Sequence, residues 1–130
     1  MVEHEKEATR VDLAVSTDDV NGARVVIVGG EVDVYTAPLL RDALDQQIAA
    51  GHVHLVVDLD AVDFMDSTGL GVLVGRLKLV RNRSGWLRVV CSNERVLKVF
   101  GITGLDRVFT IAESVEVAAR PAEADEGDED

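Results

Sequence analysis

The stretch Asp63–Gly71 reads DFMDSTGLG and stands between an apolar run and a run with helical spacing. Apolar side chains continue beyond it at Leu70, Leu73, Val74, Leu77 and Val80. This period of 3.6 residues predicts a helix from about Ser67 to Asn82, with Ser67 in the first turn. Backbone N–H groups there have no partner inside the helix, so Asp66 or Ser67 could be a structural cap. Ser67 could equally be a catalytic nucleophile or a residue that another protein modifies.

Enzyme signatures around Ser67 are incomplete. The Gly-x-Ser-x-Gly elbow of serine hydrolases needs a glycine where Met65 stands. The Asp-Ser/Thr-Gly pattern of aspartic proteases is one residue shorter than Asp66–Gly69. A dinucleotide-binding glycine pattern that begins at Gly69 would place its third glycine at Val74. We therefore expect no catalytic residue, no cofactor and no metal site at this turn.

The best enzyme alternative is the preceding run LVVDLDAV, residues 55–62. In a phosphotransferase of the haloacid dehalogenase type, Asp58 would accept a phosphoryl group and Asp60 would be a general acid. Such enzymes also need a downstream acidic pair to hold magnesium, and none follows Val62 outside the C-terminal tail. This alternative stays open, although the missing acidic pair weakens it.

The segments around the stretch predict an α/β fold. Two β-branched runs, VDLAVST (11–17) and ARVVIVGG (23–30), flank a turn that contains Gly22, which is typical of an antiparallel hairpin. Further strands are expected at 53–59, 86–91 and 107–111, and helices at 36–50, 67–82, 93–101 and within 113–120. Because these strands and helices alternate, we expect a mixed sheet of four to five strands with about four helices packed against it.

Composition limits the classes of protein to consider. The chain has 130 residues, 47% of them hydrophobic, and a formal net charge of −11. It is long enough for one domain, expected at 11–120, between a flexible N-terminal segment (1–10) and an acidic, disordered tail (121–130). No apolar run has membrane-spanning length and the first residues are polar, so a cytoplasmic protein is expected. No basic face is evident for nucleic acid, and the single Cys91 is expected to be an inert buried thiol.

One side of the predicted helix carries an unusual mixture of residues. Steps of 100° place Val72, Arg76, Leu79 and Arg83 together, opposite the core stripe. The glycines that follow Ser67 lower helix propensity and suggest that something approaches the backbone closely. We therefore expect this side and the Ser67 turn to form a protein-binding surface, unless the helix is buried on both sides.

Three segments together resemble one known family. FMDSTGLGVLVGRLK (64–78) is similar to the signature of STAS-domain anti-sigma factor antagonists, the bacterial anti-anti-sigma proteins. GGEVDVYTAPLL (29–40) resembles the family's strand-to-helix segment, with Asp33 at its acidic position. VLKVFGITGLDRVFTI (96–111) resembles its closing helix, turn and strand, and the similarity extends over about Val11 to Val117. The resemblance implies a STAS-like mixed sheet.

The resemblance also implies a function. Ser67 corresponds to the family's phosphorylated serine, with Thr68 as the second choice. The unphosphorylated protein would bind an anti-sigma factor that has serine kinase activity and so release a sigma factor, and a metal-dependent serine phosphatase would restore it. The alternative is a phosphorylation-independent STAS scaffold of a stress-sensing or transport complex. The expected partner-binding residues are Asp33, Asp66, Ser67, Thr68, Gly69, Val72, Arg76 and Leu79, in a protein that is a monomer or weak dimer.

Charge gives this switch a physical basis. A phosphate on Ser67 would add about −1.5 to −2 charges at a helix N-terminus, where the dipole and free N–H groups offset it and the fold survives. At a closed interface near Asp66 and Asp33, the same charge would oppose binding.

Overall fold

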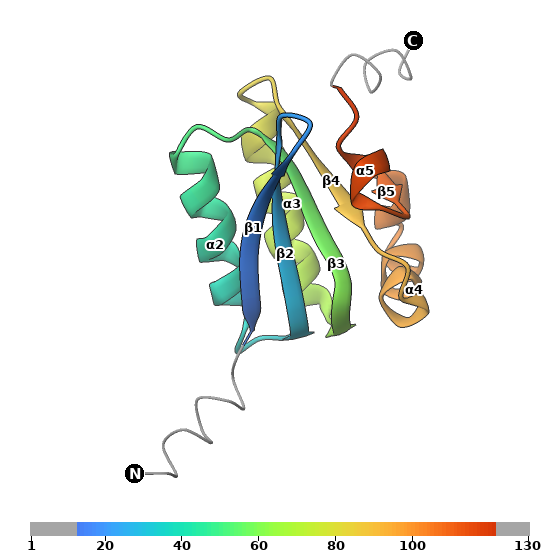
Figure 1. Cartoon of the computed structure of the whole chain (residues 1–130). Coiled ribbons are helices and arrows are strands. Elements are labelled where there is room, and N and C mark those ends of the chain that lie inside the picture. Colours follow the sequence, from blue (N-terminus) through green and yellow to red (C-terminus); the bar gives the residue numbers. More distant parts are fainter. Residues whose placement is uncertain (1–12, 122–130) are drawn as a thin grey trace.

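The computed structural model describes residues 13–121, which form a five-stranded mixed sheet with four α-helices (Figure 1). The strands are β1 (Ala14–Val20), β2 (Ala23–Val32), β3 (His54–Met65), β4 (Trp86–Val90) and β5 (Ile111–Ala112). The α-helices are α2 (Ala37–Ala49), α3 (Ser67–Arg81), α4 (Glu94–Thr103) and α5 (Val115–Ala118), and a 3₁₀ turn, η1, spans Leu105–Arg107. The predicted mixed sheet of four to five strands with about four helices is confirmed.

A tight hairpin opens the sheet. Asn21 and Gly22 have positive φ angles of 54° and 84°, as the two central residues of a type I′ turn require. This turn fixes the antiparallel register in which Val20 pairs with Ala23 and Val15 with Val28. The predicted hairpin is therefore present, and β1 continues three residues beyond the expected end at Thr17.

The remaining strands pair in parallel, in the order of the chain, through helical crossovers. β2 pairs with β3, β3 with β4, and β4 with the short β5. Parallel neighbours need a long connection, and α2, α3 and α4 provide it between successive strands. The carboxyl ends of β2 and β3 consequently meet at the same end of the sheet, where α3 begins.

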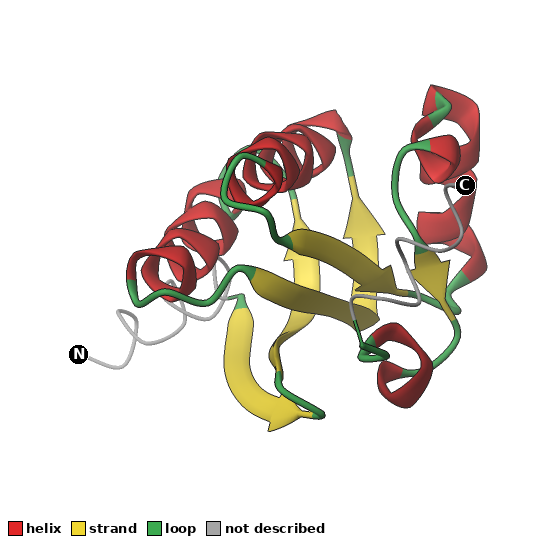
Figure 2. Ribbon diagram, turned by 90° about the horizontal axis from the view of Figure 1, so that it is seen from above, coloured by secondary structure: helices red, strands yellow, loops and turns green. Residues whose placement is uncertain are grey.

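The two faces of the sheet are covered unequally. α2 and α3 lie side by side on one face, whereas α5 lies on the other (Figure 2). The larger core, under α2, α3 and α4, contains fully buried residues such as Leu40, Leu73 and Phe100. A smaller core under α5 is built mainly from valines and alanines, among them Val56 and Ala118. Helix α3, which begins at Ser67, thus packs on the larger of the two cores.

Two expected strand boundaries were wrong. β3 runs on to Met65 instead of ending near Leu59, because Val62 and Met65 are buried and continue the pairing with β2. The expected strand at 107–111 is reduced to Ile111–Ala112. α4 continues past Gly101 and ends at Gly104, whose φ of +78° suits a left-handed helix cap and leads into the 3₁₀ turn.

The structure describes neither end of the chain. The expected N-terminal segment (1–10) and almost all of the expected acidic tail (121–130) lie outside the described residues. Within residues 13–121, no helix is both long and apolar enough to cross a membrane.

Phe100 tests how strongly α4 stabilises the larger core. Its side chain is fully buried and meets Phe109 edge-on, with 5.8 Å between the ring centroids. We expect Phe100→Ala to lower the free energy of unfolding by roughly 3–5 kcal/mol, through lost burial and a cavity. Ile102→Ala, on the same helix but 76% exposed, should change it by less than ~0.5 kcal/mol. Urea denaturation of both variants makes the comparison, and equal effects would contradict this account of the core.

Candidate functional site

Ser67 lies where two parallel strands end. Val32, the last residue of β2, pairs with Met65, the last residue of β3. The N–H of Asp66 then donates to the carbonyl oxygen of Val32, at 3.1 Å. The two loops that leave these strands, one toward α2 and one toward α3, are thereby joined at their bases.

Asp66 caps helix α3. Its backbone is extended, and its Oδ1 accepts hydrogen bonds from the N–H groups of Thr68 (2.9 Å) and Gly69 (3.3 Å). Of the two cap candidates in the sequence, Asp66 therefore takes the role. The expectation that free N–H groups would offset a phosphate needs correction, because two of those groups already bond the Asp66 carboxylate.

The Ser67 hydroxyl is available for chemistry. Ser67 is exposed at the first position of α3, and its side chain makes no hydrogen bond to any residue within 13–121. Thr68 is exposed as well, and its hydroxyl is equally free of partners in the described part of the chain. Both hydroxyls can therefore be reached by another protein, on a turn that the Asp66 cap holds in place.

Asp33 shapes the neighbouring loop. Its Oδ1 accepts hydrogen bonds from the N–H groups of Tyr35 (2.9 Å) and Thr36 (3.1 Å). The buried Thr36 hydroxyl donates to the carbonyl oxygen of Glu31, at 2.7 Å, and accepts from the N–H of Asp33, at 3.0 Å. The β2–α2 loop is thus an ordered turn, in which the Asp33 carboxylate and the Thr36 hydroxyl hold the backbone.

Gly69 allows α3 to begin close to β2. A Cβ atom at this position would lie 2.6 Å from Cγ1 of Val32 and 3.0 Å from Cγ of Met65. A Cβ at Gly71 or Gly75 would meet nothing within 4 Å. The close approach expected from the glycines therefore exists at Gly69 alone, and it comes from this chain's own core.

The predicted outer side of α3 is only partly exposed. Val72 is half-buried against the core, and Nε of Arg76 lies 3.2 Å from Oδ1 of Asp45 on α2. Arg83 is exposed but donates a 3.2 Å hydrogen bond to the carbonyl oxygen of Ile48. The packing of α2 beside α3 therefore covers part of this side. Leu79, which is 41% exposed, is the apolar residue of the group that faces solvent.

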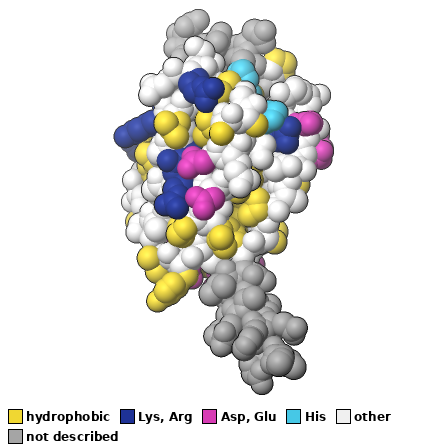
Figure 3. Space-filling model, turned by 90° about the vertical axis from the view of Figure 1, so that its left-hand side faces the viewer, with side chains coloured by type: hydrophobic (Ala, Val, Ile, Leu, Met, Phe, Trp, Pro, Cys, Tyr) yellow, Lys and Arg dark blue, Asp and Glu magenta, His cyan; other side chains and the backbone are white. Residues whose placement is uncertain are grey.

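Exposed apolar residues near Ser67 were missed in the sequence. Val34 (60% exposed) and Tyr35 (77%) stand on the Asp33 loop, and Phe64 (47%) precedes the Ser67 turn. Figure 3 looks onto the α2 side and shows hydrophobic side chains gathered at its lower end, where β2 and β3 end. The signal was the run VDVY directly before a helix start, with two apolar residues in a segment too short to bury them.

The geometry does not favour the phosphotransferase alternative. Asp58 lies seven residues before the end of β3, not at the strand's carboxyl end. Asp60 Oδ1 is engaged by the N–H (2.8 Å) and the hydroxyl (3.0 Å) of Ser92. Among residues 13–121, no group of three or more His, Cys, Asp or Glu side chains could hold a metal ion.

Cys91 is a buried free thiol, as expected. Burial, together with the nearby Asp60 and Asp58 carboxylates, raises the pKa of this thiol, although a hydrogen bond to Asn93 opposes the shift. A raised pKa suits an unreactive cysteine.

Comparisons with known proteins agree with one another. A family model described as the STAS domain matches residues 14–118. An anti-sigma-B factor antagonist of Bacillus subtilis is 39% identical over 106 residues, which are 82% of this chain and 93% of that protein. One from Listeria monocytogenes is 41% identical over 86 residues, 66% of this chain and 75% of the relative. The crystal structure of an anti-sigma factor antagonist from Mycobacterium paratuberculosis is 31% identical and superposes with a TM-score of 0.76, covering 83% of this chain and 92% of that one.

Alanine substitutions at the α3 glycines should have opposite effects. Gly69→Ala forces Cβ against Val32 and should lower the free energy of unfolding by roughly 1–3 kcal/mol. Gly75→Ala, where the space is open, should raise it by up to ~1 kcal/mol through helix propensity. Urea denaturation of the two variants decides, and a stabilising Gly69→Ala would show that α3 does not depend on this close approach.

Proposed function

The chain belongs to the STAS-domain anti-sigma factor antagonist family, and from this membership we propose that it regulates transcription by partner switching. Its unphosphorylated form binds an anti-sigma factor that is also a serine kinase, and a sigma factor is released. Phosphate on Ser67 ends that binding, and a metal-dependent serine phosphatase restores it. The protein acts in the cytoplasm as substrate and switch, and it catalyses no reaction itself.

The observation that carries the proposal is the presentation of Ser67. A kinase needs a hydroxyl that it can reach on a backbone of defined shape. Ser67 is exposed, has no hydrogen-bond partner within residues 13–121, and directly follows the Asp66 cap. The names of the relatives supply the partner class, since those proteins are antagonists of anti-sigma factors.

The charges around Ser67 support a switch that acts on binding. A phosphate would add about −1.5 to −2 charges beside Asp66, whose carboxylate already takes the N–H groups of Thr68 and Gly69. Few N–H groups therefore remain free near Ser67 to offset the charge of the phosphate. Most of that charge must be matched by the partner's surface at the interface. An unmatched charge that costs roughly 3 kcal/mol there weakens affinity more than a hundredfold, since each ~1.4 kcal/mol is a factor of ten.

The apolar residues beside Ser67 suggest where the partner's contact area lies. Val34 and Tyr35 are held outward by the hydrogen bonds of Asp33, and Phe64 lies on the strand that leads to Ser67. An exposed tyrosine on an ordered loop binds at a low cost in conformational entropy. Asp33, Asp66 and Gly69 then shape the surface, while Ser67, Thr68 and Leu79 contact the partner. Val72 and Arg76 contribute mainly through the packing of α3 on α2.

Substitutions at Ser67 test the switch. Ser67→Ala should bind the anti-sigma factor as the wild type does, and Ser67→Asp should bind at least ~100-fold more weakly because of its charge. Ser16→Asp, at an exposed serine of the edge strand β1 outside the proposed contact residues, is the matched control for an added charge and should bind normally. Isothermal titration calorimetry gives the affinities, and equal binding by the Ala and Asp variants at Ser67 would refute the charge switch.

The site of modification can be read directly. After incubation with ATP and the anti-sigma kinases of the source organism, mass spectrometry should find one phosphate, on Ser67. The Ser67→Ala variant should remain unmodified. A phosphate on Thr68 would keep the switch and move its site by one residue. No phosphate with any of these kinases would favour the phosphorylation-independent scaffold instead.

A further inference from the structure

β1 forms one edge of the sheet that the structure describes. Among the described residues, β1 pairs with β2 alone and stands at one end of the strand order. The opposite edge belongs to β5, which has only two residues. An unpaired strand edge is a template for another strand, so β1 is the place where this sheet can be extended.

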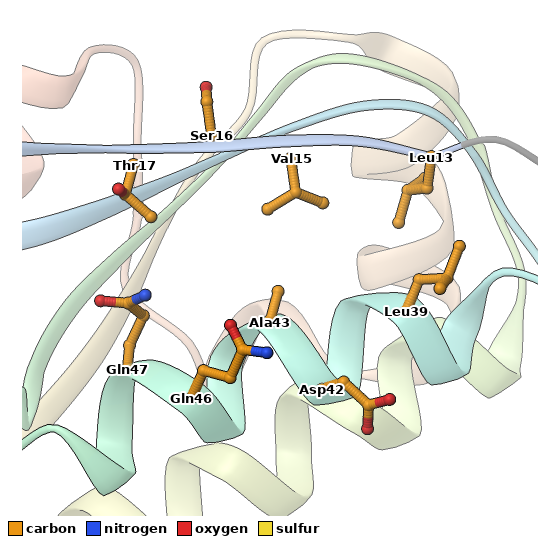
Figure 4. Close-up of a pocket in the computed structure, with 9 residues that line it drawn as sticks. All are labelled: Leu13, Val15, Ser16, Thr17, Leu39, Asp42, Ala43, Gln46 and Gln47. Carbon is orange, nitrogen blue, oxygen red and sulfur yellow. The ribbon is translucent and has the colours of Figure 1, made fainter.

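The hairpin register determines which backbone groups point outward along β1. A two-residue turn makes Val20 and Ala23 a hydrogen-bonded pair, and the two kinds of pair alternate from there along an antiparallel ladder. The N–H and C=O groups of Leu13, Val15 and Thr17 therefore point away from β2. The side chains of the same three residues point toward α2, whereas Ser16 points to the other face (Figure 4).

A groove runs along this edge, between β1 and α2. Its volume is about 610 Å³, and Figure 4 shows the two walls facing each other across open space. One wall consists of Leu13, directly before β1, and of Val15 and Thr17 on β1; the other includes Leu39, Ala43 and Gln46 on α2. Val15 (37% exposed) and Leu39 (45%) leave apolar surface in the groove uncovered.

We propose that a second copy of this chain closes the groove, by antiparallel pairing of β1 with β1 about a two-fold axis at Val15. Leu13 of each copy then lies opposite Thr17 of the other, and the two sheets become one. The added strand would bring its own Leu13, Val15 and Thr17 to the same face, beneath Leu39 and Ala43. Each groove is filled by the residues that form the wall of the other.

One observation favours a second copy over a different peptide, and another limits the register of the pairing. The interface is self-complementary, because the strand that lines the groove has the alternating side chains that an added strand must supply. Asp18 and Asp19 follow Thr17 on the same strand, and charges of this kind protect an edge against pairing. They confine the free segment to residues 13–17, which the register centred on Val15 uses in full.

The net charge of the chain sets the strength of this association. Each copy carries a formal charge of −11, so two copies repel each other over long range. A short strand pair must overcome that repulsion, and the dimer is therefore weak and concentration-dependent. Salt screens the repulsion, so raising the ionic strength should strengthen the dimer.

Sedimentation velocity of the full chain tests the interface with two variants of the same strand. The wild type should shift from monomer to dimer as its concentration rises from micromolar to near millimolar. Val15→Lys places two cations at the two-fold axis and should weaken association at least ~10-fold. Ser16→Lys adds the same charge to the opposite face of β1 and should leave association nearly unchanged.

Cysteine cross-linking tests the register independently of charge and folding defects. Under mild oxidation, Val15→Cys should form a disulfide-linked dimer, because residues paired across an antiparallel ladder have the Cα separation that a disulfide needs. Ser16→Cys, displaced from its counterpart along the strand, should cross-link far more slowly, and the wild type should not cross-link through its buried Cys91. A wild type that stays monomeric without any Val15→Cys cross-link would overturn the proposal. So would a dimer that both lysine variants weaken equally, or one that cross-links equally at both positions.

Discussion

The close approach of helix α3 to the end of strand β2 is the constraint on which the candidate site depends. Gly69 packs against Val32 with no room for a Cβ atom, and the N–H of Asp66 donates to the carbonyl oxygen of Val32. This contact sets the position at which α3 leaves the sheet and therefore the position of Ser67. It also brings the Asp33 loop alongside, because that loop starts from the same Val32. The Ser67 hydroxyl, the Asp66 helix cap and the Asp33 loop are thus all positioned by contacts with Val32.

Much of the fold could be predicted because its signals are periodic. The apolar spacing of α3, the alternation of helices with strands, and the turn at Asn21–Gly22 each depend on neighbouring residues alone. The boundaries that were wrong depend on tertiary contacts. β3 continues to Met65 because β2 is there to pair with it, and the segment after Gly104 turns aside so that Phe109 can meet Phe100. Contacts of this kind, between segments far apart in the chain, cannot be predicted from the local pattern of a single sequence.

The position of Ser67 could be predicted from the sequence, whereas the exposure of the residues around it could not. The position of Ser67 in the first helical turn follows from the apolar pattern, and the assignment of the cap to Asp66 needed atomic geometry. The exposure of Val72 and Arg76 was overestimated, because a helical wheel contains no α2. Tyr35 and Val34 were missed since apolar residues in a loop are expected to be covered. The hydrogen bonds of Asp33 and Thr36 hold the loop in a shape that leaves both side chains exposed.

The strands of the sheet lie side by side in the order in which the chain is made. Every residue that builds the Ser67 turn and the Asp33 loop comes from the stretch between Glu31 and Leu70. The hydrogen bonds of the turn and of the loop therefore involve no residue of α4 or α5. Among the described residues, none after β4 contributes a hydrogen bond to this turn or loop, so the segment around Ser67 supplies both the packing and the surface of the site.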